Sequence, residues 1–254
     1  MSKRFNELLK CRKKAWNNNN KMDISGTEVF GLCVAFKGYR NPLDSWEFGD
    51  SYIGEYGRNY FRNNVLCEDF IIGEKDLNLA QRLIKAGGEH SKFMRQIQVW
   101  CNINMTRYFW SEFDTYHFNS KNSCSTMHKL LNAKNKITLD MFEYYDEDVD
   151  IITAVVNRLN EIRQLFLNSI NTEEKRVLKR RAKTLLFEGF LQLRTVNTNY
   201  AELRNIVLQR RNHQLKEDWQ DVFCNWVTTL PYAKELIFCG IEDDYIRLLG
   251  KSNE

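Results

Sequence analysis

The sequence contains little that interrupts regular secondary structure. Only 2 prolines and 12 glycines occur in 254 residues, so few positions force a turn, and long helices with few loops are predicted. The 7 cysteines include no Cys-x-x-Cys pair, which argues against a zinc or dithiol motif and favours reduced thiols in a cytoplasmic protein. No apolar run approaches the ~20 residues that span a bilayer, so no membrane segment is predicted.

An excess of charge of one sign is also lacking. The chain has 37 Lys and Arg against 33 Asp and Glu, and the resulting net charge of +4 is too small to predict nucleic acid as a partner. A hydrophobic fraction of 43% is enough for a sizeable core and excludes disorder over most of the chain. The opening residues MSKRFNELLKCRKKAW lack the apolar stretch and small residues of a secretory signal.

The start of the chain is predicted to be separate from the rest. Residues 3–16 can form a helix, but the four asparagines at 17–20 compete with helical hydrogen bonds through their side-chain amides. We therefore expect a mobile N-terminal segment over 1–22 and a single domain over 23–254.

Apolar periodicity predicts strands early in the chain and helices late. Residues 27–36 are apolar on both alternations, as expected for a central strand covered on both faces, and residues 93–105 alternate between apolar and polar. The remaining predictions are a short strand over 65–72, a long ordered loop over 38–63, an irregular loop over 117–128, and helices over 74–86, 107–116, 149–170, 173–191, 199–212 and 215–228. This order predicts an α+β fold with a small central β-sheet and long helices.

Polar residues suited to phosphate binding gather in the middle of the chain. His90, His117 and His128 fall within 39 positions, beside a loop rich in serine and asparagine. Hydroxyl, amide and backbone N–H groups are suitable donors to phosphate oxygens, although isolated histidines are also common as structural residues. No metal-binding His spacing, Gly-Lys-Ser/Thr loop or Gly-x-Ser-x-Gly turn is present, so no metal site, phosphate loop or serine hydrolase is predicted.

Two predicted helices carry basic residues. The helix over 173–191 has six cations, which fit either phosphate binding or a solvated face: Lys175, Arg176, Lys179, Arg180, Arg181 and Lys183. On the helix over 199–212, Leu203, Ile206 and Val207 are expected to face the core. Arg210 then lies at the helix end, where it can point into a pocket.

Two separated blocks match one protein family. In the first block, Glu89-His90 precedes a strand, and Arg107 and Glu112 follow. Thr115-Tyr116-His117 then stands two residues before a serine-rich stretch, SKNSCSTMH at 120–128, in which Ser125 follows the triplet after seven residues. The second block consists of Lys183, Asn199, Leu203, Asn205 and Arg210. In spacing, both blocks resemble the flavin-dependent thymidylate synthases, whose signature is an Arg-His-Arg triplet followed by Ser-x-Asn-Glu-x-Ser-x-Arg-Tyr.

This chain departs from the signature at several charged positions. The triplet has lost both arginines, Ser123 replaces a glutamate, and Met127 replaces an arginine. The family uses those charges to hold the flavin diphosphate and deoxyuridylate, and each lost charge-assisted hydrogen bond removes about 1.5–3 kcal/mol.

The resemblance implies roles for individual residues. It implies flavin-side roles for His90, His117, Asn199 and Asn205. It implies nucleotide-side roles for Glu112, Ser123, Ser125, Lys183 and Arg210, with Arg210 as the catalytic residue that polarises the base. It further implies FAD as cofactor, a reduced folate as carbon donor, NADPH as reductant, a pyrimidine nucleotide as substrate, and a homotetramer with shared sites.

The loop over 38–63 has no counterpart in the family pattern. Arg40-Asn41-Pro42 combines a cation with a turn, and Trp46 is suited to stacking on a planar ring. Arg40 is therefore a candidate substrate ligand in place of a missing triplet arginine, and a loop packed by its own aromatic residues is the alternative.

Three functions remain open from the sequence. The first is a divergent flavin-dependent thymidylate synthase, a methyltransferase of pyrimidine metabolism. The second is a protein of the same fold that binds or sequesters a nucleotide without catalysis, and the third is a protein-interaction role on this scaffold.

Overall fold

The computed structural model describes residues 22–131 and 136–250, together forming two compact units. The first unit contains Ile103–Thr115 and Asn122–Arg194, and the second contains Ile24–Asn102, Tyr116–Lys121 and the chain from Thr195 onward. The helix predicted over 3–16 and the asparagines at 17–20 lie outside the described residues.

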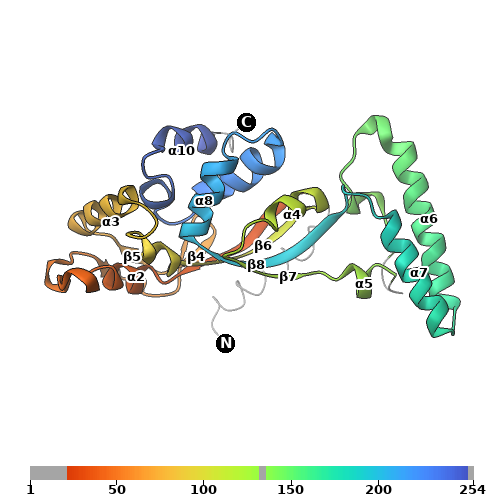
Figure 1. Cartoon of the computed structure of the whole chain (residues 1–254), viewed down its shortest axis with the longest axis horizontal. Helices are drawn as coiled ribbons and strands as arrows, with labels where there is room; N and C mark the ends of the chain where they lie inside the picture. The colour runs from red at the N-terminus through yellow and green to blue at the C-terminus, as the bar shows by residue number, and fades with distance from the viewer. Residues whose placement is uncertain (1–21, 132–135, 251–254) are drawn as a thin grey trace. The chain divides into compact units, whose positions relative to one another are not determined.

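A mixed six-stranded sheet confirms the predicted α+β class (Figure 1). Its strand order is β3 (Tyr60–Arg62), β4 (Val65–Cys67), β1 (Asp23–Phe30), β6 (Gln98–Thr106), β8 (Leu191–Asn199) and β7 (Ser120–Ser123). A separate antiparallel pair joins β2 (Tyr52–Ile53) to β5 (Phe70–Ile71). β1 lies inside the sheet, as predicted, and runs parallel to β4 with Glu28 opposite Leu66.

The strand predicted over 27–36 is wrong beyond Phe30, where β1 ends, because helix α2 (Leu32–Gly38) begins two residues later. Gly31 separates the two elements with a φ of 97°, and a Cβ atom at this position would lie 2.5 Å from the carbonyl oxygen of Gln96. The Glu68 carboxylate accepts hydrogen bonds from the backbone N–H groups of Gly31 and Cys33, each at 3.2 Å. The apolar run is therefore shared between a strand and a helix, each of which buries only part of its residues.

The strand predicted over 65–72 is divided into β4 and β5. β4 also forms a hairpin with β3, in which Tyr60 lies opposite Cys67 and Arg62 opposite Val65. The connection is Asn63-Asn64, with φ of 49° and 65°, the two positive values that a type I′ turn requires. Within the predicted loop over 38–63 lie β2, β3 and two short 3₁₀ helices, η1 (Asn41–Leu43) and η2 (Trp46–Phe48).

The second unit contains several helical elements besides α2. α3 (Glu74–Ala86) has the predicted bounds and ends at Gly87, which has a φ of 112°. The other helical elements are η3 (Lys92–Arg95), α8 (Tyr200–Arg210), η6 (Glu217–Cys224), α9 (Asn225–Thr228), η7 (Ala233–Ile237) and α10 (Glu242–Leu249). The helix predicted over 215–228 is thus a π-helical segment, η6, continued by α9, a hydrogen-bond pattern that apolar periodicity does not distinguish.

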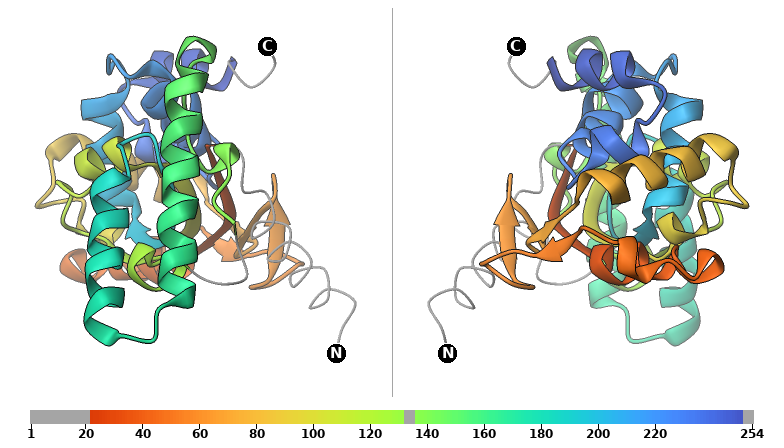
Figure 2. Two further views of the ribbon diagram at one scale, coloured as in Figure 1. Left: turned by 90° about the vertical axis from the view of Figure 1, so that its right-hand side faces the viewer. Right: turned by 90° about the vertical axis from the view of Figure 1, so that its left-hand side faces the viewer.

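The first unit contains a long helical hairpin, α6 (Val149–Asn168) and α7 (Thr172–Leu185), visible in Figure 2. Leu159, Ile162, Leu178 and Ala182 are buried between these helices. The unit also contains α4 (Arg107–Phe113), α5 (Thr126–Lys129) and the 3₁₀ helices η4 (Leu139–Met141) and η5 (Asp146–Asp148). None of the helices in the two described ranges has the length and apolar character needed to cross a membrane.

Two predictions in this region are wrong. The helix predicted over 173–191 ends at Leu185, and β8 begins at Leu191 after a turn at Gly189, where a Cβ atom would lie 2.5 Å from the carbonyl oxygen of Glu143. The irregular loop predicted over 117–128 contains β7 and the start of α5. β7 pairs with β8 through contacts distant in sequence, which local patterns do not reveal.

Candidate functional site

The N-terminal half of α8 holds the segment 116–119 in place. Asn199 is the N-cap of α8: its side-chain oxygen accepts from the Glu202 N–H at 3.0 Å, and its amide nitrogen donates to the Phe118 carbonyl at 3.4 Å. The buried Glu202 carboxylate accepts from the Phe118 N–H at 3.3 Å and from the Asn205 amide at 3.5 Å. His117, between two residues tied to α8, is exposed.

The C-terminal end of α8 fixes Arg210. Its Nε donates to the Tyr116 hydroxyl at 2.8 Å, and its Nη1 lies 2.8 Å from His213 Nε2. The guanidinium carbon lies 4.5 Å from the ring centroid of Trp219, which is fully buried. Because an arginine nitrogen can only donate, His213 Nε2 is the acceptor in this pair.

The chemistry of Tyr116 follows from its burial. Burial raises the pKa of its phenol, although the hydrogen bond from Arg210 opposes this effect. The phenol therefore stays neutral and donates its proton to Gln209 Oε1 at 3.2 Å. We call Tyr116, His117, Asn199, Asn205 and Arg210 the α8 surface; four predicted site residues lie on it, spread along the length of α8 in the second unit.

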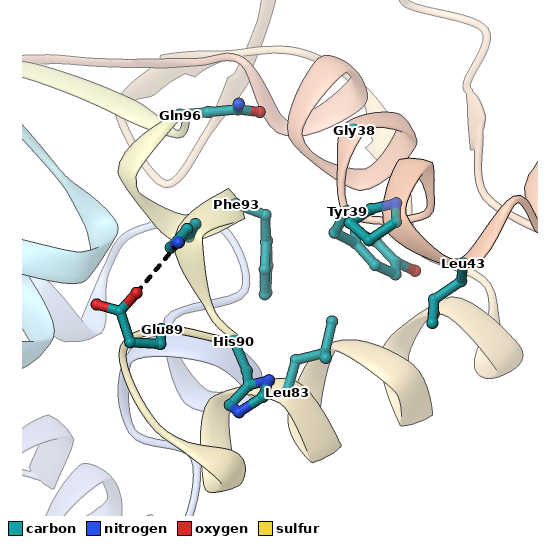
Figure 3. A pocket seen from close by; sticks show the side chains of 10 residues that line it. Gly38, Tyr39, Leu43, Leu83, Glu89, His90, Phe93 and Gln96 are labelled. Atoms are coloured by element: carbon teal, nitrogen blue, oxygen red, sulfur yellow. Dashed lines mark ion pairs between the residues drawn. The ribbon is translucent and has the colours of Figure 1, made fainter.

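His90 lies in a pocket of about 340 Å³ in the same unit, shown in Figure 3. Tyr39, which follows α2, and Phe93 in η3 form aromatic walls with ring centroids 5.3 Å apart. An ion pair between Glu89 and Lys92, 3.1 Å long, lies at the rim. The pocket is thus an apolar cleft with imidazole, carboxylate and ammonium groups at its edge.

Arg40 stabilises its own loop through buried hydrogen bonds. It is buried, and its Nε donates to Asp76 Oδ1 at 2.8 Å while its other nitrogens donate to the carbonyls of Ser45 and Phe48. Burial alone would raise the pKa of Asp76, but hydrogen bonds from Ser51, Tyr39 and Arg40 together lower it. The Arg40–Asp76 pair therefore stabilises the loop that contains η1 and η2.

A second pocket, of about 290 Å³, lies within the first unit and is lined by Ser125, the N-cap of α5. The other predicted nucleotide-side residues of this unit do not line it. Glu112 is half-buried on α4, Ser123 is exposed on β7, and Lys183 is exposed in the last turn of α7. Among the described residues, no group of three His, Cys, Asp or Glu side chains is arranged to hold a metal ion.

Solved structures provide the comparison for this arrangement. No family model matches the chain, and no curated protein does. A crystal structure of the Helicobacter pylori flavin-dependent thymidylate synthase ThyX, complexed with FAD and dUMP, matches 83% of this chain and 97% of its own, with 19% identity and a TM-score of 0.57. A second ThyX structure from Helicobacter pylori with FAD and dUMP matches 85% and 96%, with 18% identity and a TM-score of 0.58. The chain has the flavin-dependent thymidylate synthase fold.

This fold confirms the resemblance that the two sequence blocks predicted. Within the flavin-dependent thymidylate synthase fold, all four predicted flavin-side residues belong to the second unit of this chain. Most nucleotide-side residues belong to the first unit: Glu112, Ser123, Ser125 and Lys183. Arg210 and Arg40 belong to the second.

Sequence reasoning missed the residues that hold Arg210. Tyr116 was visible as the centre of the altered triplet, and His213 lies three residues after Arg210, which is one helical turn. Trp219 gave no local signal, because its place under the guanidinium depends on the π-helical segment. Lys129 was also missed, although it lies four residues after Ser125 and lines the same pocket.

Proposed function

We propose that this chain binds a flavin and a pyrimidine nucleotide of the deoxyuridylate type, with the flavin bound against the α8 surface. The observation that carries the proposal is that Asn199, Asn205 and Arg210 lie along one helix, α8, which also holds the segment that contains His117. The similar ThyX structures contain FAD and dUMP. In the catalytic form of the proposal, the chain methylates the nucleotide.

Arg210 suits the polarisation of a pyrimidine ring. Tyr116 and His213 fix its orientation, and Trp219 shields one face of the guanidinium from water, which strengthens its interaction with charge that develops on a ligand. An oriented donor of this kind acts without reorganisation during the reaction.

The surface also offers groups that fit a flavin. The imidazole of His117 and the amides of Asn199 and Asn205 are donors and acceptors of the kind that ring carbonyl and imide groups require. When bound, the flavin would supply hydride, a reduced folate the carbon and NADPH the electrons.

One observation favours a second candidate, nucleotide binding without methylation. Arg40, the cation that the sequence offered in place of a triplet arginine, is buried against Asp76 and cannot turn to a ligand without breaking this pair. A flavin diphosphate would then lack the charges that the family signature provides. A protein that binds or sequesters a nucleotide without a flavin does not need those charges.

The proposal also includes assembly of the chain into a homotetramer. The family resemblance implies a homotetramer with sites shared between subunits. Light scattering on the full chain tests this directly: a tetramer supports shared sites, and a monomer at working concentration contradicts them.

Flavin binding is tested by the visible absorption spectrum of the purified protein, with and without added FAD, and by chromatography of the released ligand. A bound flavin supports the catalytic form, which is then assayed as methylation of deoxyuridylate. The resemblance implies a flavin-side role for His90 as well, so His90→Ala is expected to lower the flavin content; equal content in variant and parent removes this role of His90. A protein that takes up no flavin but binds dUMP supports the second candidate.

Nucleotide binding is tested by calorimetry with dUMP. Arg210→Ala is expected to weaken binding at least about tenfold, because a charge-assisted hydrogen bond is lost. Arg82→Ala, which removes an exposed arginine of α3, is the control and should leave the affinity unchanged. Unchanged affinity of the Arg210→Ala variant for every pyrimidine nucleotide would remove the assignment.

A further inference from the structure

A series of side-chain hydrogen bonds runs along α8 from Arg210 to Glu202. Arg210 Nε donates to the Tyr116 hydroxyl at 2.8 Å, and this hydroxyl donates to Gln209 Oε1 at 3.2 Å. The Gln209 amide nitrogen donates to Asn205 Oδ1 at 2.9 Å, and the Asn205 amide nitrogen donates to Glu202 Oε2 at 3.5 Å. All five residues belong to the second unit.

Every bond in this series points the same way. The donor end is a cation, the Arg210 guanidinium, and the acceptor end is the carboxylate of Glu202, which is 4% exposed. Each neutral group between them accepts on one side and donates on the other, so each bond polarises the next and strengthens it. The two end charges therefore set the direction of the series, because reversing one amide would place two donors or two acceptors face to face.

Gln209 joins the two halves of the series. Its Oε1 accepts the proton of Tyr116, so the oxygen of this phenol is turned to accept from Arg210. Its amide nitrogen holds the oxygen of Asn205. Gln209 is itself exposed and lies in the last turn of α8. It thus acts on one residue predicted for the nucleotide side and on one predicted for the flavin side, while it belongs to neither set.

We propose that Gln209 is a positioning residue of the α8 surface, which orients Arg210 through Tyr116 and sets the direction of the Asn205 amide. The inference rests on the proposed function, in which Arg210 contacts the pyrimidine nucleotide and Asn205 the flavin. Binding of both ligands then depends on one exposed amide.

Calorimetry with dUMP tests the action of Gln209 on Arg210. Gln209→Met is expected to weaken binding about three- to fivefold, because the phenol of Tyr116 is no longer held as an acceptor for the guanidinium. Gln209→Glu keeps an acceptor for the phenol and should bind dUMP more tightly than Gln209→Met does. Glutamine, glutamate and methionine have similar helix propensities, so a role in helix stability alone predicts equal affinities, and equal affinities would overturn the proposal.

Gln164→Met is the matched control for these variants. It replaces an exposed glutamine of α6 by the same residue and should leave the affinity for dUMP unchanged.

A double-mutant cycle tests whether Gln209 acts through Tyr116. Tyr116→Phe removes the hydroxyl that joins Gln209 to Arg210, so adding Gln209→Met to this variant should weaken dUMP binding by less than about twofold further. If the two effects multiply in full, Gln209 acts independently of the phenol and the assignment is wrong.

FAD binding tests the action of Gln209 on Asn205. Neither glutamate nor methionine can donate to Asn205 Oδ1, so Gln209→Glu and Gln209→Met should both weaken FAD binding about two- to fivefold, measured by the change in flavin fluorescence. The two variants thus differ for dUMP and agree for FAD. An FAD affinity equal to that of the parent in both variants would remove the action on Asn205.

A measurement without ligand separates this proposal from the proposed function. The NMR signal of the Arg210 Nε–H group, assigned by its loss in Arg210→Lys, should exchange with water several-fold faster in Gln209→Met than in the parent. If the parent binds neither ligand but this signal responds, the proposed function fails and the positioning by Gln209 stands. If the signal is the same in both proteins, Gln209 does not position Arg210, whichever ligand is bound.

Discussion

Arg40 and Asp76 show how much a single buried side chain depends on its partner. Both are almost completely buried, and the Asp76 carboxylate also accepts hydrogen bonds from Tyr39 and the Ser51 N–H. Removing one member of a buried pair leaves an uncompensated charge in a place that water does not reach. The position of Arg40 beside a turn was readable from the sequence. Its partner, 36 residues away, was not.

Asp76→Asn is expected to lower the free energy of unfolding by about 3–5 kcal/mol, because the guanidinium of Arg40 loses its counter-charge. The pKa of Asp76 is lower in the folded chain than its ordinary value of 3.8, so its stabilisation is present above that pH and is lost as the pH falls further towards the folded pKa. Urea unfolding between pH 7 and pH 3 should show the difference between parent and variant shrinking only at the acidic end. Asp146→Asn, at an exposed carboxylate, should stay within about 0.5 kcal/mol of the parent. A difference that does not change with pH would contradict this account.

Helices and strands whose ends are set by residues close to them in the sequence could be predicted from the sequence. α3 has its predicted bounds because a helical apolar period and Gly87 both lie within a few residues of its ends. β7 and β8 were missed because a strand is stabilised by a neighbour that is distant in sequence. The boundary at Gly31 was missed for a related reason: the apolar pattern continues through it, and only the approach of the Gln96 carbonyl reveals the break.

Gly31→Ala and Gly87→Ala are expected to differ in their effects on stability. Both glycines have positive φ, so either alanine introduces backbone strain of about 1–3 kcal/mol. Only at Gly31 does the new Cβ atom also meet a backbone oxygen at 2.5 Å, whereas at Gly87 nothing lies within 4 Å. Thermal unfolding of both variants should show the larger loss for Gly31→Ala, and equal losses would mean that the chain at Gln96 moves away easily.

At the scale of the whole molecule, the chain passes several times between two compact units. This interleaving explains why composition and the order of elements predicted the fold class correctly but gave no sign of two units. Sequence spacing assigned Ser125 and Arg210 to one ligand; the two residues belong to different units, and their shared ligand stays a prediction.

Leu159→Ala tests whether the first unit opens by itself. Leu159 is fully buried in the α6–α7 hairpin, and its truncation is expected to cost about 2–5 kcal/mol. Hydrogen exchange measured by mass spectrometry should quicken in α6 and α7 while α8 keeps its protection. Leu165→Ala, at a half-exposed position of the same helix, is the control with little expected change. Faster exchange throughout the chain would show that the two units unfold together.

The Asn63-Asn64 turn limits how this protein can tolerate insertions. A two-residue turn with both φ values positive fixes which residues of β3 and β4 face each other. One additional residue would exchange the inward and outward sides of β3, so a natural relative or an engineered version should preserve the length here even when it changes the residues. At Gly88, by contrast, no neighbouring atom lies within 4 Å of an added Cβ, so a change of residue that keeps the length of the chain should be tolerated there.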